Sequence, residues 1–400
     1  MLIKKDLKSP KSEIKLTLKN ISLVLFSTTA WLGLKPYIIL NHNEFLSFFV
    51  YLSFILVILF NSFSKKKIEI LFAIIYFLIC IFFFIPGSES VNKSISLGFL
   101  SISIILFLNN SDRIRLIENF RIIYVITLIP SLTIYFLDLI GFSPNYSIIN
   151  GFKNPYIGYD FLGSFGNVKT TISEGFLVYR FQGMYDEPGV IGTISGLLLL
   201  IENFNFKKKF NYLLLVSGFA SLSMAFYIIT LLYIVFVKKI NIKYLIITIL
   251  LIFSMTQFKF TRYYIIERLR FNTETGKLKF DNRVSSSFQE LYDSKIKNGD
   301  IFHKVFGYGS NAHSKNNFNV ASYKALIYNK GYFGFILIIL FYLFYFRYYI
   351  KEYQNQVIIL IFLTSIYQRP DVVSLFYSII FFGGVSKLYY KELLKKTNTL

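Results

Sequence analysis

The sequence is poor in the residues that most often build metal centres and covalent cross-links. Among its 400 residues there is one cysteine, Cys80, and there are three histidines, His42, His303 and His313. A single cysteine excludes an intramolecular disulfide and a thiolate metal cluster, and Cys80 lies within an apolar run. We therefore expect no metal site and no cofactor.

Charged residues are also scarce, and acids are scarcer than bases. Only 16% of the residues are charged, and 43 lysines and arginines against 22 acids give a formal net charge of +21. Such a charge could indicate nucleic-acid binding, but the basic residues form short clusters between apolar runs. Clusters of this kind set the topology of membrane proteins, so nucleic acid is not expected as a partner.

Apolar residues, in contrast, are abundant. They make up 54% of the chain, and the mean hydropathy of +0.53 lies above the range of soluble domains. Several apolar runs reach the roughly 20 residues needed to cross a hydrocarbon core about 30 Å thick. Because the strands of a membrane barrel would alternate polar and apolar residues, these runs predict a bundle of helices.

The expected fold is an all-α polytopic membrane protein, with residues 1–400 forming one integral-membrane domain. With twelve spans, all seven clusters of lysine and arginine fall on one side, and short basic loops prefer the cytoplasm. Both termini are then cytoplasmic. The expected spans are residues 21–40, 46–63, 68–86, 95–109, 119–140, 188–203, 211–223, 224–237, 243–257, 319–346, 355–367 and 372–387.

Two of the boundaries depend on local arguments. Residues 211–237 are long for one helix and short for two, and lysines flank the run on both sides, so we expect a tight hairpin that turns near Ser221 and Ser223. Near the C-terminus, Pro370 ends a helix, and Arg369 and Asp371 mark an external turn.

Two long segments, about 141–187 and 258–318, are expected outside the membrane, whereas every cytoplasmic loop is short. We therefore expect the functional residues in these two segments. The second segment carries eleven basic residues against six acids. This excess would favour an anionic ligand at the membrane surface.

The stretch RFQGMYDEPGVIG, which begins at Arg180, places charges at the start of an expected span. Pro188 suits the first turn of a helix, and Asp186 and Glu187 complement the positive end of the helix dipole. A cation is unfavourable there, but Arg180 is well placed to bind a phosphate held against the helix start. The alternatives are that the acids only begin the helix and that Arg180 only anchors the chain at the interface.

The stretch GYGSNAHSKNNF, residues 307–318, is the second candidate. Gly307 and Gly309 bracket a turn, and His313 follows it. A histidine beside such a turn suits a general base, because its charge changes near neutral pH. The alternative is a solvated loop histidine, and Arg283 can equally be one basic residue among many.

With these residues, the chain resembles the superfamily of O-antigen polymerases and O-antigen ligases, which are bacterial envelope glycosyltransferases. RFQGMYDEPGVIG resembles the Arg, Gly, Glu/His-Pro element of that family, and DNRV at 281–284 resembles its second-loop arginine. GYGSNAHSKNNF and the later YNKGYFGFIL together resemble the family's Gly-x-Gly, His/Asn, then Gly-x-x-Gly pattern, which enters a late span. These features cover about residues 175–346.

The resemblance implies a GT-C-like bundle in the bacterial inner membrane that joins polyprenyl-diphosphate-linked sugar units at the outer face without a metal. Expected partners are the polyprenyl-diphosphate-linked oligosaccharide, membrane lipid and a chain-length regulator protein. Many relatives carry an arginine in the middle hairpin, where this chain has SLSMA. The residues implied are Arg180, Arg283 and Arg262 for the diphosphate, His313 and Glu187 for catalysis, and Gly183, Pro188, Gly307 and Gly309 for the shape of the site.

A polymerase is the leading hypothesis for the activity. The nearest alternative is a ligase that transfers a finished glycan to another lipid or protein, since both share the residues of the donor site. The alternative from another class is an exporter of polysaccharide or lipid-linked sugar without chemistry. The scarcity of ionisable residues within the expected spans argues against it.

Overall fold

The computed structural model describes most of the expected helices. The described residues are 10–36, 43–84, 102–142, 146–150, 155–159, 167–171, 177–185, 187–238, 271–272, 277–278, 284–316, 318, 320, 322–367, 369 and 372–398. The expected span 243–257 and three candidate residues, Asp186, Arg262 and Arg283, lie outside them.

The described part of the chain is mostly helical, as expected, and ten of the twelve expected apolar runs correspond to described helices. The long helices are α1 (Pro10–Leu32), α2 (Asn43–Phe60), α3 (Lys67–Phe84), α5 (Asn110–Leu139), α6 (Pro188–Ile201), α7 (Phe210–Ala220), α8 (Met224–Leu232) with its π-helical continuation η2 (Tyr233–Val237), α15 (Tyr323–Tyr349), α16 (Tyr353–Thr364) and α17 (Leu375–Asn398). The shorter ones include α12 (Ser286–Tyr292), η4 (Asp293–Lys297), α13 (Ile301–Phe306), α14 (Ala312–Lys315) and η5 (Ser365–Tyr367).

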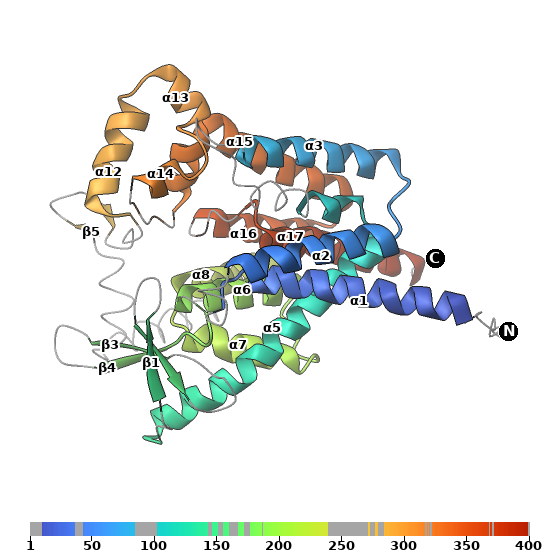
Figure 1. Cartoon of the computed structure of the whole chain (residues 1–400), viewed down its shortest axis with the longest axis horizontal. Helices are drawn as coiled ribbons and strands as arrows, with labels where there is room; N and C mark the ends of the chain where they lie inside the picture. The colour runs from blue at the N-terminus through green and yellow to red at the C-terminus, as the bar shows by residue number, and fades with distance from the viewer. Residues whose placement is uncertain are drawn as a thin grey trace.

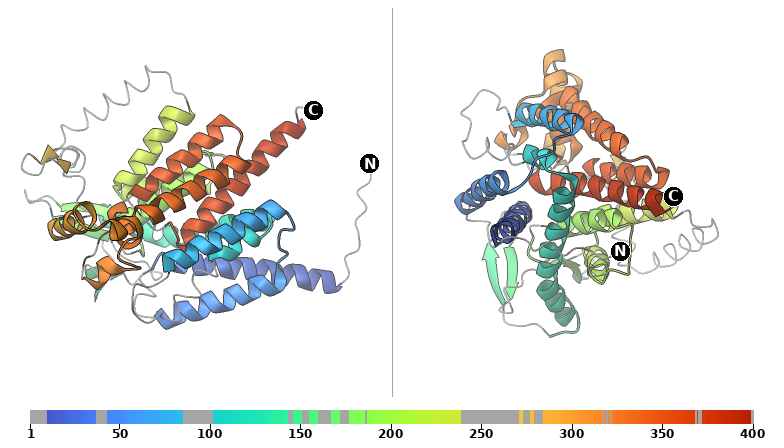
Figure 2. Two further views of the ribbon diagram at one scale, coloured as in Figure 1. Left: turned by 90° about the horizontal axis from the view of Figure 1, so that it is seen from above. Right: turned by 90° about the vertical axis from the view of Figure 1, so that its right-hand side faces the viewer.

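The helices lie side by side and form a bundle with two distinct ends (Figures 1 and 2). The start of α1 and the end of α17 lie at one end, which we call the terminal end. Helices α12 to α14 and the strands that precede α6 lie at the opposite end, which we call the loop end. The described parts of the two segments expected to be external therefore lie at the same end of the bundle.

The expected hairpin at residues 211–237 is confirmed. Helix α7 ends at Ala220, and α8 begins at Met224. Both pack on α6, and Gly192 of α6 allows the turn to approach, because a Cβ there would lie 2.2 Å from the Cβ of Ser223. At the other end of α8, the Tyr233 hydroxyl donates a hydrogen bond to the carbonyl oxygen of Asn203 at 2.8 Å. Helix α8 thus returns beside α6 toward the terminal end.

Small β-hairpins at the loop end differ from the all-α expectation. The strands are β1 (Tyr146–Asn150), β2 (Pro155–Tyr159), β3 (Asn167–Thr171), β4 (Leu177–Phe181), β5 (Phe271–Asn272) and β6 (Lys277–Leu278), paired in antiparallel order as β1–β2, β3–β4 and β5–β6. Strands of two to five residues produce no long apolar run, so the search for membrane-length runs missed them. Strand β4 precedes the turn that leads into the start of α6.

The outward faces of the long helices are apolar. Among the described helices, α5 and α15 are long and apolar enough to cross a membrane. In the most apolar 18-residue stretch of each helix, 44% of α5 and 50% of α15 is buried. A core helix of a soluble protein would be mostly buried, with polar residues on any outer face. These helices instead expose apolar side chains spaced along one face, which favours a membrane protein. The exposed side chains include Ile122, Ile126, Ile129 and Phe136 of α5 and Phe333, Ile336, Leu340 and Phe344 of α15.

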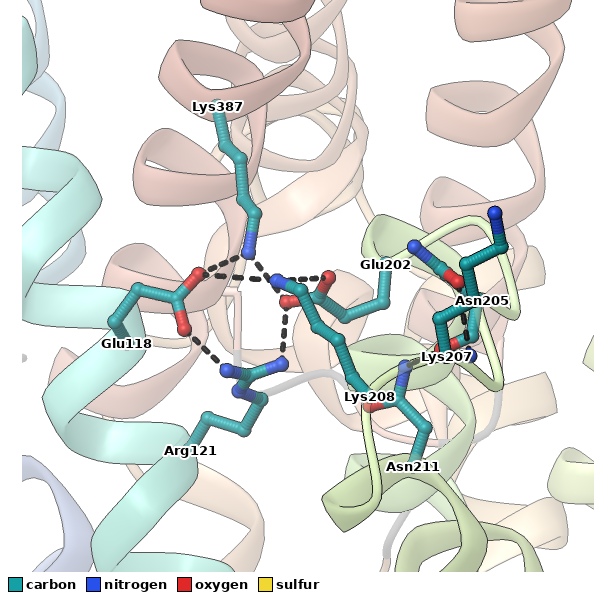
Figure 3. A network of polar contacts seen from close by, with 8 residues as sticks. All are labelled: Glu118, Arg121, Glu202, Asn205, Lys207, Lys208, Asn211 and Lys387. Carbon is teal, nitrogen blue, oxygen red and sulfur yellow. Dashed lines mark hydrogen bonds and ion pairs between the residues drawn. The ribbon is translucent and has the colours of Figure 1, made fainter.

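A cluster of charged side chains joins α5, α6 and α17 at the C-terminal end of α6 (Figure 3). Arg121 donates hydrogen bonds to Glu202 at 2.7 Å and to Glu118 at 2.5 Å. The ammonium group of Lys208 lies 2.9 Å from the other oxygen of Glu202, and Lys387 contacts both carboxylates. Lys208 and Lys387 belong to the basic clusters that set the expected topology, and in the structure they also neutralise the buried Glu202 and the partly exposed Glu118. We call these five residues the ion cluster.

Removal of the central carboxylate should destabilise the fold. In Glu202→Ala, three cations lose their shared, 3% exposed partner, and we expect the free energy of unfolding to fall by about 3 kcal/mol. The control is Glu352→Ala, which removes a more exposed ion pair with Lys395 and should cost less than about 1 kcal/mol. Equilibrium unfolding in mixed micelles measures both variants. Equal losses would contradict a stabilising role of the ion cluster.

Candidate functional site

Arg180 lies in β4, just before the turn that leads into α6. Its Nε donates a hydrogen bond at 3.2 Å to the carbonyl oxygen of Ser221, in the turn between α7 and α8. The turn of the α7–α8 hairpin thus supports Arg180 through a backbone carbonyl. After β4, Gly183 adopts a positive φ of 58°, and a Cβ at this position would lie 3.2 Å from the side chain of Ile191. This turn therefore needs glycine in order to bring the strand against α6.

Glu187 and Pro188 begin α6, as expected from the sequence. Glu187 is the N-cap residue and Pro188 follows within the first turn. The carboxylate makes no capping hydrogen bond to the helix. Instead, its Oε2 accepts a hydrogen bond at 3.0 Å from Arg369. Glu187 is thereby held in place by a cation from a distant part of the chain.

Arg369 was not expected from the sequence to be a site residue, but only to mark an external turn. Its side chain is 14% exposed, and among the described residues its buried Nε has no hydrogen-bond partner. The available indication of a functional role was that this guanidinium lies at the edge of an expected span, next to a proline. Its position next to Glu187 became clear only in the structure.

His313 lies in α14 and is fastened to Asn329 of α15. The backbone N–H of His313 donates to the Asn329 side-chain oxygen at 3.3 Å, and the imidazole Nδ1 lies 3.1 Å from the same oxygen and 2.9 Å from the Asn329 side-chain nitrogen. The Ser314 hydroxyl lies 3.1 Å from Nε2. Burial lowers the pKa of His313 below its ordinary value, and the hydrogen bond with Asn329 opposes this shift. Burial therefore favours the neutral imidazole, which is the state a general base requires.

The glycine turn before His313 is packed against the same part of α15. Gly307 has a positive φ of 76°, and a Cβ there would lie 2.4 Å from the backbone of Asn329. The backbone N–H of Gly309 donates a hydrogen bond to the carbonyl oxygen of Asn329 at 2.9 Å. Asn329 thus contacts both the turn and the histidine, so the glycines help to fix the position of His313.

An aromatic contact joins the segment of Arg369 to the helix of Asn329. Tyr367 lies two residues before Arg369 and stacks on Tyr323 in the first turn of α15, with ring centroids 5.0 Å apart. Two groups of candidate residues result. One is near the start of α6 and consists of Arg180, Glu187 and Arg369. The other is His313, which contacts Asn329 in the first half of α15. Both groups are at the loop end of the bundle (Figure 1).

The described residues contain no group of three or more histidine, cysteine, aspartate or glutamate side chains that could hold a metal ion. No protein-family model matches the chain, and no curated protein and no solved structure is similar to it. The functional hypothesis therefore depends on the residues of the site themselves.

Proposed function

We propose that the chain is a metal-independent glycosyltransferase that polymerises the repeat units of a surface polysaccharide. It transfers a glycan from a polyprenyl-diphosphate donor to a second lipid-linked repeat unit at the outer face of the inner membrane. The observation that carries the proposal is the presence, at one end of the bundle, of two arginines near a helix start and a partly buried histidine that is hydrogen-bonded to Asn329. A diphosphate leaving group requires cations, and an acceptor hydroxyl requires a base.

The arginines serve the leaving group. Guanidinium groups bind phosphate oxygens bidentately and neutralise the charge that develops on the departing diphosphate. Arg180 is the first such residue, and the resemblance adds Arg283 or Arg262. The buried Nε of Arg369 makes this residue a further candidate for the second cation. The positive end of the dipole of α6 lies nearby and favours the same negative charge.

His313 serves the acceptor. The role requires the tautomer in which Nδ1–H donates to the Asn329 oxygen at 3.1 Å, because Nε2 then keeps a lone pair that can accept a proton. In the other tautomer Nδ1 accepts from the Asn329 side-chain nitrogen at 2.9 Å and Nε2 carries the proton. The acceptor oxygen forms a bond to the anomeric carbon, its proton moves to His313, and the bond to the diphosphate breaks with the electron pair leaving on the phosphate oxygen. Glu187 is the alternative base, and its ion pair with Arg369 fixes the orientation of its carboxylate.

The proposed orientation has a direct test. With twelve spans and cytoplasmic termini, reporter fusions at Asn150 and Lys295 should give an external location, because both residues lie in the loop-end segments. A fusion at Lys209, between α6 and α7, should give a cytoplasmic location. A cytoplasmic reading at Asn150 or Lys295 would place the candidate site on the wrong side of the membrane for this reaction.

Deletion of the gene distinguishes the activities. Loss of a polymerase should leave single repeat units attached to the final acceptor, and loss of a ligase should leave none, as judged from surface glycan on a gel. Purified protein with synthetic lipid-linked donor should lengthen glycans. Transport across vesicles without any bond formation would favour the exporter, and unchanged surface glycan would contradict the polymerase and the ligase alike.

A further inference from the structure

A polar pocket lies at the end of α6 remote from Arg180. Its volume is about 550 Å³, and among the described residues it is lined by the connection from α6 to α7, by the end of η2 and by α17. The lining residues that matter here are Lys207, Lys238, Lys391, Glu202, Phe206 and Tyr212. Three separate parts of the chain thus each contribute one lysine to a single pocket.

The pocket carries an excess of positive charge. Among the described lining residues, the acid is Glu202, and its carboxylate is already bound by cations of the ion cluster. Within the described part of the chain, Lys207, Lys238 and Lys391 form no ion pair. Lys238 only faces the ring of Tyr233, at 5.9 Å from its centroid. In Figure 3, Lys208 is directed into the ion cluster, whereas the ammonium group of Lys207 makes no contact there. Three ammonium groups are therefore available to an anion.

Lys391 shows the effect of this crowding. Burial lowers the pKa of its ammonium group, Glu202 opposes the shift, and the neighbouring Lys387 and Lys208 add to it. Like charges held close together in a partly buried site destabilise one another. A bound anion would relieve this repulsion, and a phosphate group offers oxygens to several ammonium groups at once.

The other wall of the pocket is aromatic and continues into an apolar stripe. The rings of Phe206 and Tyr212 lie 5.3 Å apart. From Tyr212, exposed apolar side chains follow along α7 at Val216 and Phe219, a spacing that puts all three on one face of the helix. This face leads away from the lysines toward the turn at Ser221. The combination suits an anion that carries a hydrocarbon chain.

We propose that this pocket binds the phosphate headgroup of an anionic membrane lipid, whose acyl chain lies along Tyr212, Val216 and Phe219. The assignment does not depend on the glycosyltransferase function. Basic pockets between helices, at the membrane surface, are suited to such headgroups. A lipid in this position would contact the α7–α8 hairpin, whose turn holds Arg180.

The test uses the full chain purified in a neutral detergent, with short-chain phosphatidylglycerol as the probe and native mass spectrometry as the measurement. The triple variant Lys207→Gln, Lys238→Gln, Lys391→Gln should bind this lipid about tenfold or more weakly than the unmodified chain. The matched control is Lys65→Gln, Lys66→Gln, Lys67→Gln, which removes three charges from another exposed basic cluster. The control should change the affinity by about twofold or less. Replacement of the three pocket lysines by arginine should preserve binding.

Three further measurements keep the result decisive. Short-chain phosphatidylcholine should bind with no difference between the variants, because it carries no net negative charge. If the triple variant does not fold, each single Lys→Gln change should weaken phosphatidylglycerol binding severalfold. Equal losses in the pocket variant and the control would overturn the proposal. Displacement of the lipid by an equal concentration of inorganic phosphate would show a site for free phosphate and would overturn the lipid assignment.

Discussion

Replacement of Arg180 by alanine is expected to abolish polymer at normal protein levels and to lower the rate of glycan transfer by about a hundred- to a thousandfold. This is the usual cost of removing one electrostatic contact to a developing anion. Arg180→Lys should restore little activity, because lysine keeps the charge but loses the planar pair of donors. Surface glycan on a gel and the transfer rate of purified protein measure the effect.

Two controls separate catalysis from folding in this experiment. Arg115→Ala removes an exposed arginine of α5 whose side chain, among the described residues, hydrogen-bonds Asn20 alone, and it should keep full activity. Because Arg180 also holds the carbonyl of Ser221, the melting temperature of the alanine variant must be compared with that of the unmodified chain. Full transfer activity in Arg180→Ala would reduce the residue to an interfacial anchor.

The second large effect is expected at His313. Glutamine can form hydrogen bonds in its place but cannot accept and keep a proton, so turnover of His313→Gln should fall by about a hundredfold or more. Donor binding should be preserved, because the arginines are intact. Burial lowers the pKa of His313 below its ordinary value of 6.5, so the neutral base forms as the pH rises through a transition below 6.5. This acid limb of the pH–rate profile should disappear in the variant.

The control for this change is His303→Gln. His303 lies ten residues before the candidate base, is partly exposed, and is hydrogen-bonded to Asp300. It should leave both the rate and the pH profile unchanged. Purified enzyme with synthetic lipid-linked donor provides the measurement. An unchanged rate and profile in His313→Gln would remove His313 from catalysis and would shift the search for a base to Glu187 or Asp186.

Local patterns in the sequence predicted the helices well. The start of α6 followed from Pro188 after two acids, and the turn near Ser221 followed from the lysines that flank residues 211–237. Each of these indications involves only neighbouring residues. Apolar length, helix-start chemistry and flanking charge are properties of a short segment, so they can be interpreted without tertiary contacts.

Contacts between distant charged residues could not be predicted in this way. Glu187 and Arg369 are 182 positions apart, and Lys387 and Glu202 are 185 positions apart. Arg113 lies with Arg115 in one of the seven basic clusters that set the expected topology, yet it is buried and bound to Glu69 at 3.0 Å. The sequence does not distinguish an ionisable residue that faces water from one that pairs with a buried partner. The packing of the helices decides which of these environments the side chain has.

The sequence by itself therefore determined a helical chain with apolar runs of membrane length, and it indicated where charges gather beside those runs. The tertiary structure decided which of these charges meet. It set Arg369 against Glu187, fastened His313 to Asn329, and surrounded the acids of the ion cluster with lysines and an arginine. The physical reason is that helix formation depends on neighbours within a few residues, whereas ion pairs and hydrogen bonds between helices depend on how the whole bundle packs.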